Sequence, residues 1–172
     1  ITASFSSTNA NPPTVENAAS TGQALASFSG KYLAPSNDVG TVVEISFDQP
    51  VSGVELKFAT MEPANFAVTS DVQLTAFDTS SGTEVSVGTA IAHGTVVAGD
   101  SLPSGTLTFN SAGQTFDRVR IQLPAQPLGA TKFFIDDITV SPGGSTGGTM
   151  TLANPNWNIT LTDFGYSDFL LD

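Results

Sequence analysis

The stretch TVVEISF, residues 41–47, decides the fold class. Its apolar residues Val43, Ile45 and Phe47 alternate with polar ones. Side chains on a β-strand point alternately to opposite faces, so this period of two predicts a half-buried strand. Such a pattern is typical of antiparallel sheets, which pack one face on a core and leave the other to solvent.

The same alternation recurs along most of the chain. It appears in GVELKFA (53–59), DVQLTAFD (71–78) and FDRVRIQL (116–123), and shorter candidates are TASFS, ALASFS, EVSVG, AIAHGTVVA and GTLTF. Turn-forming residues separate these segments, as in SND, DQP and SSG. No segment sustains the i, i+3, i+4 spacing of a helix. We therefore predict an all-β fold, a two-sheet sandwich or a barrel, with about eight or more short strands.

The composition limits the classes of partner that we expect for this chain. The chain has 172 residues, no cysteine, 12% charged residues and a net charge of −11 at pH 7. Such a chain repels phosphate backbones and anionic lipids, so we expect no nucleic-acid partner. No run of about 18 apolar residues exists, so we expect no membrane insertion. The polar but weakly charged surface predicts an extracellular or cell-surface location.

Composition also divides the chain into three parts. Residues 1–142 carry the alternating strands and predict the sandwich domain. Residues 143–149 are rich in Gly and Ser and predict a linker. Residues 150–172 hold the only Trp and one of the two Tyr. We predict that this tail either adds strands to the sandwich or begins a following unit.

The segment KFFIDDITV, residues 132–140, places two carboxylates side by side in an apolar strand. Strict alternation puts Asp136 on the inward face with Ile138 and Val140, and Asp137 on the outward face. An inward carboxylate needs a cation, several N–H donors or a metal ion, because an unpaired buried charge is costly.

Three partners are open for these carboxylates. Arg118 and Arg120 lie opposite the core face of their own strand, so we expect them outward, where they would pair with Asp137 only if the two strands are neighbours and would not reach Asp136. Backbone N–H groups are the common partners of an aspartate near a strand end. Calcium is the remaining option, because it binds carboxylate and carbonyl oxygens, and Glu16 would supply a second ligand.

Two segments carry a family resemblance, FFIDDITV and GKYLAPSNDVGTVVEISFDQPVSGVELKFA. They resemble galactose-binding-like β-jelly-roll domains, as in carbohydrate-binding modules and secreted bacterial cell-surface proteins. The likeness covers about residues 1–142. It implies a two-sheet antiparallel jelly-roll sandwich, which is our predicted fold. It also implies a structural calcium held by Asp136 and Asp137 of the last strand, with Glu16 as the nearest N-terminal candidate.

The resemblance further implies sugar binding through exposed aromatic rings and neighbouring polar groups. The candidates are Tyr32, with Asn37 and Asp38 nearby, and Trp157, which is flanked by asparagines. Each aromatic also has a structural interpretation, since Tyr32 would suit a packed position and Trp157 would anchor the tail.

We predict no catalytic residue. His93 is the only histidine, and the nucleophile-elbow pattern GGSTG at 143–147 lies in the Gly/Ser segment rather than between a strand and a helix. The predicted function is a non-catalytic extracellular binding module for carbohydrate, with calcium as an optional structural ion. The alternatives are a structural or adhesive domain of a bacterial surface protein and, in third place, a glycan-active enzyme.

Overall fold

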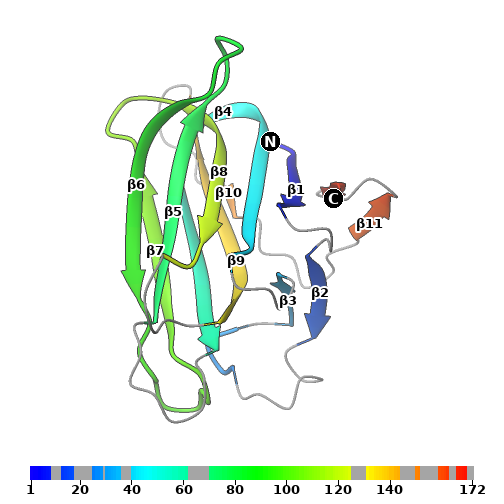
Figure 1. The fold of residues 1–172 in the computed structure, drawn as a ribbon, viewed down its shortest axis with the longest axis vertical. Helices are drawn as coiled ribbons and strands as arrows, with labels where there is room; N and C mark the ends of the chain where they lie inside the picture. Colours follow the sequence, from blue (N-terminus) through cyan, green and yellow to red (C-terminus); the bar gives the residue numbers. More distant parts are fainter. Residues whose placement is uncertain are drawn as a thin grey trace.

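The protein is described by a computed structural model, in which every strand pairing is antiparallel (Figure 1). The structure describes residues 1–8, 13–17, 25–28, 30–35, 40–61, 70–124, 131–143, 150–151, 159–162 and 166–169, the last three ranges by backbone alone. Within these ranges, no helix is long and apolar enough to cross a membrane. The strands are β1 (Ala3–Ser7), β2 (Thr14–Asn17), β3 (Lys31–Ala34), β4 (Val42–Met61), β5 (Asp71–Asp78), β6 (Val85–His93), β7 (Ser104–Asn110), β8 (Phe116–Gln122), β9 (Lys132–Pro142), β10 (Met150–Thr151), β11 (Ile159–Thr162) and β12 (Tyr166–Phe169).

Strand β4 belongs to both sheets of the sandwich. It is 20 residues long, and its first part pairs with β1 and β8 while its second part pairs with β9 and β7. The turn predicted at DQP is wrong, because residues 48–50 continue the strand. The register with β8 shifts between Ser46 and Val51, where β4 passes from one sheet to the other. Two predicted strands are therefore one.

The strand order gives two sheets around one main core. The first sheet runs β11-β12-β1-β4-β8-β5-β6, and the second contains β2, β3, β9, β4 and β7, with β10 also on β9. Buried apolar side chains from both sheets form a single cluster that includes Phe5, Ile45, Leu74, Leu107 and Ile138. The prediction of an all-β, two-sheet antiparallel jelly-roll sandwich is confirmed. The division of the chain after residue 142 stays a prediction.

A β-bulge interrupts β9. Its register with β4 shifts between Asp136 and Thr139, so that Asp137 and Ile138 together face a single residue, Leu56. Asp137 has a positive φ of 49°. This left-handed conformation is unfavourable for most side chains, but Asp and Asn adopt it more readily than others. The bulge therefore depends on the residue type at position 137.

The bulge reverses the alternation that the sequence predicts. Ile135 before the bulge and Ile138 and Val140 after it all belong to the main core. Phe134 lies on the opposite face, and Asp136 shares that face and is only 3% exposed. The inward position of Asp136 is thus right, but its assignment to the face of Ile138 and Val140 is wrong, because one extra residue inverts the pattern.

A second, smaller core covers the outer side of β3 and β9. The predicted strand ALASFS is wrong here, since residues 25–28 form a turn in which the Phe28 N–H donates to the Leu25 carbonyl at 3.0 Å. The Tyr32 ring lies edge-on to Phe28 and Phe134, with ring centroids 5.7 and 5.3 Å away. The cluster consists of Leu25, Phe28, Tyr32, Ala34, Ala59, Leu102 and Phe134.

Asp100 holds the turn that covers this second core. Its carboxylate accepts hydrogen bonds from the N–H and hydroxyl of Ser27, at 3.1 and 2.7 Å, and from the Ser104 hydroxyl at 2.7 Å. Burial by itself would raise the pKa of Asp100. The hydrogen bonds from Ser104, Ser27 and the Ala26 backbone outweigh burial and hold this pKa below its usual value.

We expect the stability of the bulge to depend more on the backbone conformation that residue 137 prefers than on the charge of this residue. Asp137→Asn should cost less than about 1 kcal/mol of unfolding free energy, because it loses a surface ion pair but still tolerates positive φ. Asp137→Val should cost about 2 kcal/mol or more, because a β-branched residue is strained there. Urea denaturation would measure both, and equal losses would contradict the assignment.

The Asp100 contacts should make stability depend on acid pH. Because the folded pKa is lowered, this contribution is present above the unfolded pKa and is lost as pH falls through the folded pKa. Asp100→Asn should therefore destabilise the protein by about 1–3 kcal/mol at pH 7 and by little near pH 2. Thermal melts of both proteins across pH would check this, and a difference that does not change with pH would refute it.

Candidate functional site

The three predicted calcium ligands lie near one another on the second sheet. Glu16 on β2 is opposite Tyr32 on β3, and the antiparallel register Leu33–Ile135 brings Tyr32 opposite Asp136 on β9. Two strand spacings separate the Glu16 and Asp136 backbones by about 10 Å. Tyr32 lies between them, and its hydroxyl donates to Glu16 Oε2 at 3.0 Å.

Each of these carboxylates has a protein partner. The Thr14 hydroxyl donates to the other Glu16 oxygen at 3.3 Å, and the Asp137 N–H donates to Asp136 Oδ1 at 2.9 Å. The Asp137 carboxylate lies 2.5 Å from the ammonium nitrogen of Lys57. Among the described strands β9 pairs with β10, β3 and β4 and not with β8, so the condition for pairing Asp137 with the arginines is not met, and Lys57 of β4 is its partner.

The placement of these residues does not fit a calcium site. Calcium takes six to eight oxygen ligands, and a cation already occupies the Asp137 side chain. In the part of the chain that the structure describes, no group of three His, Cys, Asp or Glu side chains could hold a metal ion. In the row Glu16–Tyr32–Asp136, the Tyr32 hydroxyl binds Glu16, and Asp136 is buried and accepts from the Asp137 N–H. Calcium binding stays a prediction, to be tested in solution.

Of the predicted sugar-binding residues, the structure describes only Tyr32. Tyr32 is 3% exposed and its ring is enclosed by Phe28 and Phe134, so its use as a surface for a sugar ring is corrected. Asn37, Asp38 and Trp157 lie outside the described residues. The exposed aromatic platform expected from the sequence is therefore not formed by Tyr32.

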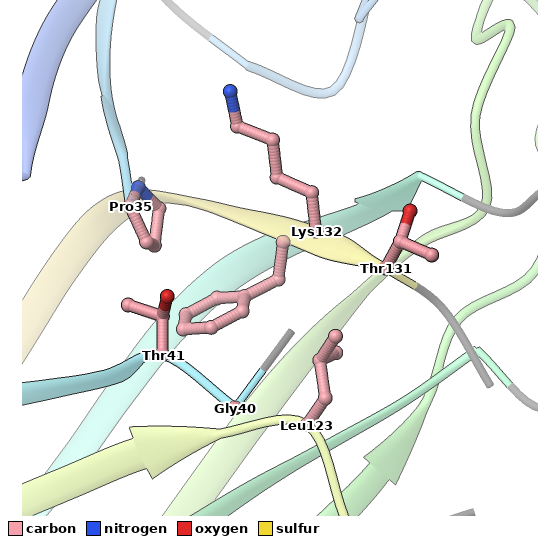
Figure 2. A pocket seen from close by; sticks show the side chains of 7 residues that line it. Pro35, Gly40, Thr41, Leu123, Thr131 and Lys132 are labelled. Carbon is pink, nitrogen blue, oxygen red and sulfur yellow. The ribbon is translucent and has the colours of Figure 1, made fainter. Parts of the chain in front are cut away.

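A small pocket lies where β3 ends and β9 begins (Figure 2). Its volume of about 10 Å³ suits one water molecule and is too small for a sugar ring. In Figure 2 the Lys132 side chain extends away from Thr41 and Leu123. Its ammonium group lies 5.1 Å from the Phe134 ring centroid, over the second core. The pocket is lined by Pro35, Gly40, Thr41, Leu123, Thr131, Lys132 and Phe133.

A broader set of side chains, all polar except Phe77, covers the solvent side of the first sheet. These residues alternate with core residues on β4, β8, β5 and β6, and the cross-strand register aligns them in rows. All of them are half-buried or exposed. We call this set the polar face; it consists of Glu44, Ser46, Gln73, Thr75, Phe77, Thr89, Arg118, Arg120 and Gln122.

Two arginines and two glutamates form an ion-pair network on the polar face and its margin. The Arg120 guanidinium binds both oxygens of Glu84, each at 2.7 Å, and its Nε donates to Glu44 at 2.8 Å. Arg118 lies 3.2 Å from Glu84 and 3.5 Å from Glu44. Burial alone would lower the pKa of Arg120, but the hydrogen bonds to Glu44 and Glu84 raise it.

One nitrogen of the network makes no hydrogen bond, and one aromatic ring is covered by an arginine. Arg118 Nε is buried and makes no hydrogen bond, since its nearest acceptor on Glu44 is 3.5 Å away. The Arg120 guanidinium carbon lies 4.7 Å from the centroid of the Phe77 ring. The sequence places both arginines outward, but only the register across β4, β8 and β5 reveals the network.

His93 forms a separate contact at the end of β6. Its Nδ1 lies 2.8 Å from Asp71 Oδ1 on the adjacent strand β5, and the imidazole is exposed. The contact is thus a cross-strand surface pair. The absence of a catalytic residue stays a prediction.

No protein-family model matches the chain, and no curated protein matches it. Among solved structures, it is similar to the CBM22-1–GH10 modules of endo-1,4-β-D-xylanase 10B from Clostridium thermocellum, complexed with xylohexaose, with 13% identity and a TM-score of 0.45. It is also similar to catalytic domains of GH87 α-1,3-glucanase in complex with nigerose (17%, 0.41) and with tetrasaccharides (16%, 0.40).

These likenesses are partial. Each covers 84% of this chain, which spans only 27–30% of the matched chains. They concern β-rich folds of carbohydrate-related proteins. Identities this low give no information about a ligand of this chain.

The role of Asp136 can be tested without assuming a metal. Asp136→Ala should lower the unfolding free energy by about 1–3 kcal/mol equally in Ca²⁺ and in EDTA, because a buried acceptor for the Asp137 N–H is lost. Asp136→Asn keeps an acceptor oxygen and should lose less. Melting curves of all three proteins in both buffers give the answer, and a loss seen only in Ca²⁺ would establish a calcium site.

Proposed function

We propose that this chain is a non-catalytic, extracellular binding module that recognises a neutral glycan through the polar face. The observation that carries the proposal is the ion-pair network of Arg118, Arg120, Glu44 and Glu84, which balances two positive against two negative charges. The rest of the chain is strongly acidic, with a net charge of −11. A locally neutral surface with many hydrogen-bonding groups favours an uncharged polar ligand.

The hydrogen-bonding inventory of the polar face matches sugar hydroxyls. A hydroxyl both donates and accepts, and so does a Gln amide. Gln73 and Gln122 lie directly opposite each other on β5 and β8. In the next row across β5 and β6, the Thr75 and Thr89 hydroxyls lie 3.2 Å apart. These neighbours would present paired donors and acceptors to one ligand.

Fixed side chains would make recognition specific without a conformational change. Arg120 is bound at three positions by two carboxylates, so little side-chain entropy is left to lose on binding. Binding energy would come from hydrogen bonds, because Arg120 already covers the Phe77 ring.

Such a site predicts weak binding. Hydrogen bonds to solvated surface groups contribute little net free energy, so we expect dissociation constants around 1 mM. This expectation separates the proposal from a deep enclosed sugar pocket, which would bind more tightly through burial of the ligand.

The test is an NMR titration with neutral oligosaccharides, beginning with xylohexaose and nigerose and extending to a glycan array. Amide shifts should move along β4, β5, β6 and β8. The double variant Gln73→Ala/Gln122→Ala should bind roughly tenfold more weakly, a loss of about 1.4 kcal/mol. Gln114→Ala, which removes the same amide from the exposed turn between β7 and β8, is the matched control and should bind as wild type.

Two outcomes would refute the proposal. NMR amide shifts confined to other parts of the chain would place the glycan site outside the polar face. No binding of any neutral glycan at millimolar concentration would favour the structural or adhesive role instead.

A further inference from the structure

An exposed aliphatic side chain stands beside the polar face. Ile91 on β6 is 59% exposed and lies opposite Gln73 on β5. Its two strand neighbours, Ala90 and Ala92, pack against the main core, so Ile91 points to solvent on the side of the polar face. A single exposed apolar residue is ordinary on a protein surface, and what distinguishes Ile91 is the set of groups around it.

The other exposed large apolar side chains of the described residues lie elsewhere. Two valines, at 96–97, follow the end of β6. Val85 lies opposite Asp78, the strand neighbour of Phe77 on the polar face, so Val85 points to the opposite side of the sheet. Among these exposed apolar residues, Ile91 is therefore the one that the sheet places beside the polar face.

Hydrogen-bonding groups surround this aliphatic side chain on three sides. Gln73 lies directly across, at the Cβ separation of about 5 Å that opposite residues have. Thr89 and His93 lie two residues away in either direction along β6, each at about 7 Å. The Thr89 hydroxyl lies 3.2 Å from the Thr75 hydroxyl, and His93 Nδ1 lies 2.8 Å from Asp71 Oδ1. These contacts hold the polar groups in place around the apolar one.

The cross-strand register places Ile91 at the end of a mixed row. Gln122 on β8 lies opposite Gln73 on β5, and Gln73 lies opposite Ile91 on β6. Adjacent strands are about 4.8 Å apart, so the row spans roughly 10 Å. Its two amides donate and accept hydrogen bonds, and its last side chain offers only methyl and methylene groups. A ligand that matches the row has polar edges and an apolar face.

We propose that Ile91 is the apolar contact of the glycan site and that the ligand is a pyranose glycan, bound with a C–H face of one ring on this side chain. This rests on the proposed glycan binding and names its ligand class. A pyranose ring with equatorial hydroxyls, as in xylose or glucose, carries its hydroxyls at the edge and C–H groups on its faces. An open-chain polyol has similar hydroxyls but no fixed apolar face.

Ile91 supplies a contact that the aromatic ring of the polar face does not. The Phe77 ring is covered by the Arg120 guanidinium, whose carbon lies 4.7 Å from the ring centroid. Apolar surface buried by a ligand contributes to affinity in proportion to its area, and convergent polar groups fix the orientation of the ligand. Ile91 would contribute the first, and the neighbouring amides and hydroxyls the second.

This placement defines how the glycan lies on the sheet. A ring seated on Ile91 brings its edge over Gln73, and the next ring along the row reaches Gln122. The glycan would then run across β6, β5 and β8 rather than along one strand. About two consecutive sugar units would fill the row, since each unit covers roughly one strand spacing.

NMR titration with xylohexaose and nigerose tests this proposal. Ile91→Ser should weaken binding roughly fivefold, because a sugar ring no longer buries the aliphatic side chain. Ile91→Trp should tighten binding about threefold or more, because a larger flat side chain covers more of the ring. Val85→Ser removes an exposed aliphatic side chain from the other side of the same strand and should bind as wild type. Sorbitol, an open-chain polyol, should leave the amide shifts of β5 and β6 unchanged.

The outcomes separate this proposal from the proposed function, and melting temperatures show whether each variant is folded. If Gln73→Ala/Gln122→Ala weakens glycan binding but neither Ile91 variant changes it, the role of Ile91 is wrong and the polar face remains the site. Equal weakening by Ile91→Ser and Val85→Ser, or equal shifts with sorbitol, would also overturn the proposal. If no neutral glycan binds at all, both proposals fail.

Discussion

The sandwich depends on one long strand that is hydrogen-bonded into both sheets. Strand β4 offers four strand edges, two in each half, and β1, β8, β7 and β9 fill them. The register of β4 with β8 shifts between Ser46 and Val51, and apolar residues from both sides of this shift belong to the same core. The relative orientation of the sheets is thus set by the continuous chain of β4 as well as by packing. The polar face on β4, β8, β5 and β6 is held in place by the same strand.

How well the sequence predicted the structure depends on how each strand is buried. In strands that are buried on one face only, apolar and polar residues alternate regularly. The sequence therefore assigns Val43, Ile45 and the outward arginines of β8 to the correct faces. Strand β9 is covered on both faces, and its bulge rests on a positive φ at Asp137, where no glycine signals it. The row Glu16–Tyr32–Asp136 and the ion-pair network arise from cross-strand register, which pairs residues far apart in sequence and leaves no local pattern.

The shared strand also governs how the chain must fold. The Lys57–Asp137 pair joins residues 80 apart, and Arg120 reaches Glu44 across 76. Two of the four edges of β4 stay unpaired until β8 and β9 are available, so loop-closure entropy must be lost before these contacts form. Chains dominated by such distant pairings fold in roughly milliseconds to seconds, far more slowly than helical bundles. During that interval β4 would expose apolar side chains and unpaired edges, so the nascent chain would be most prone to aggregation before its last strand arrives.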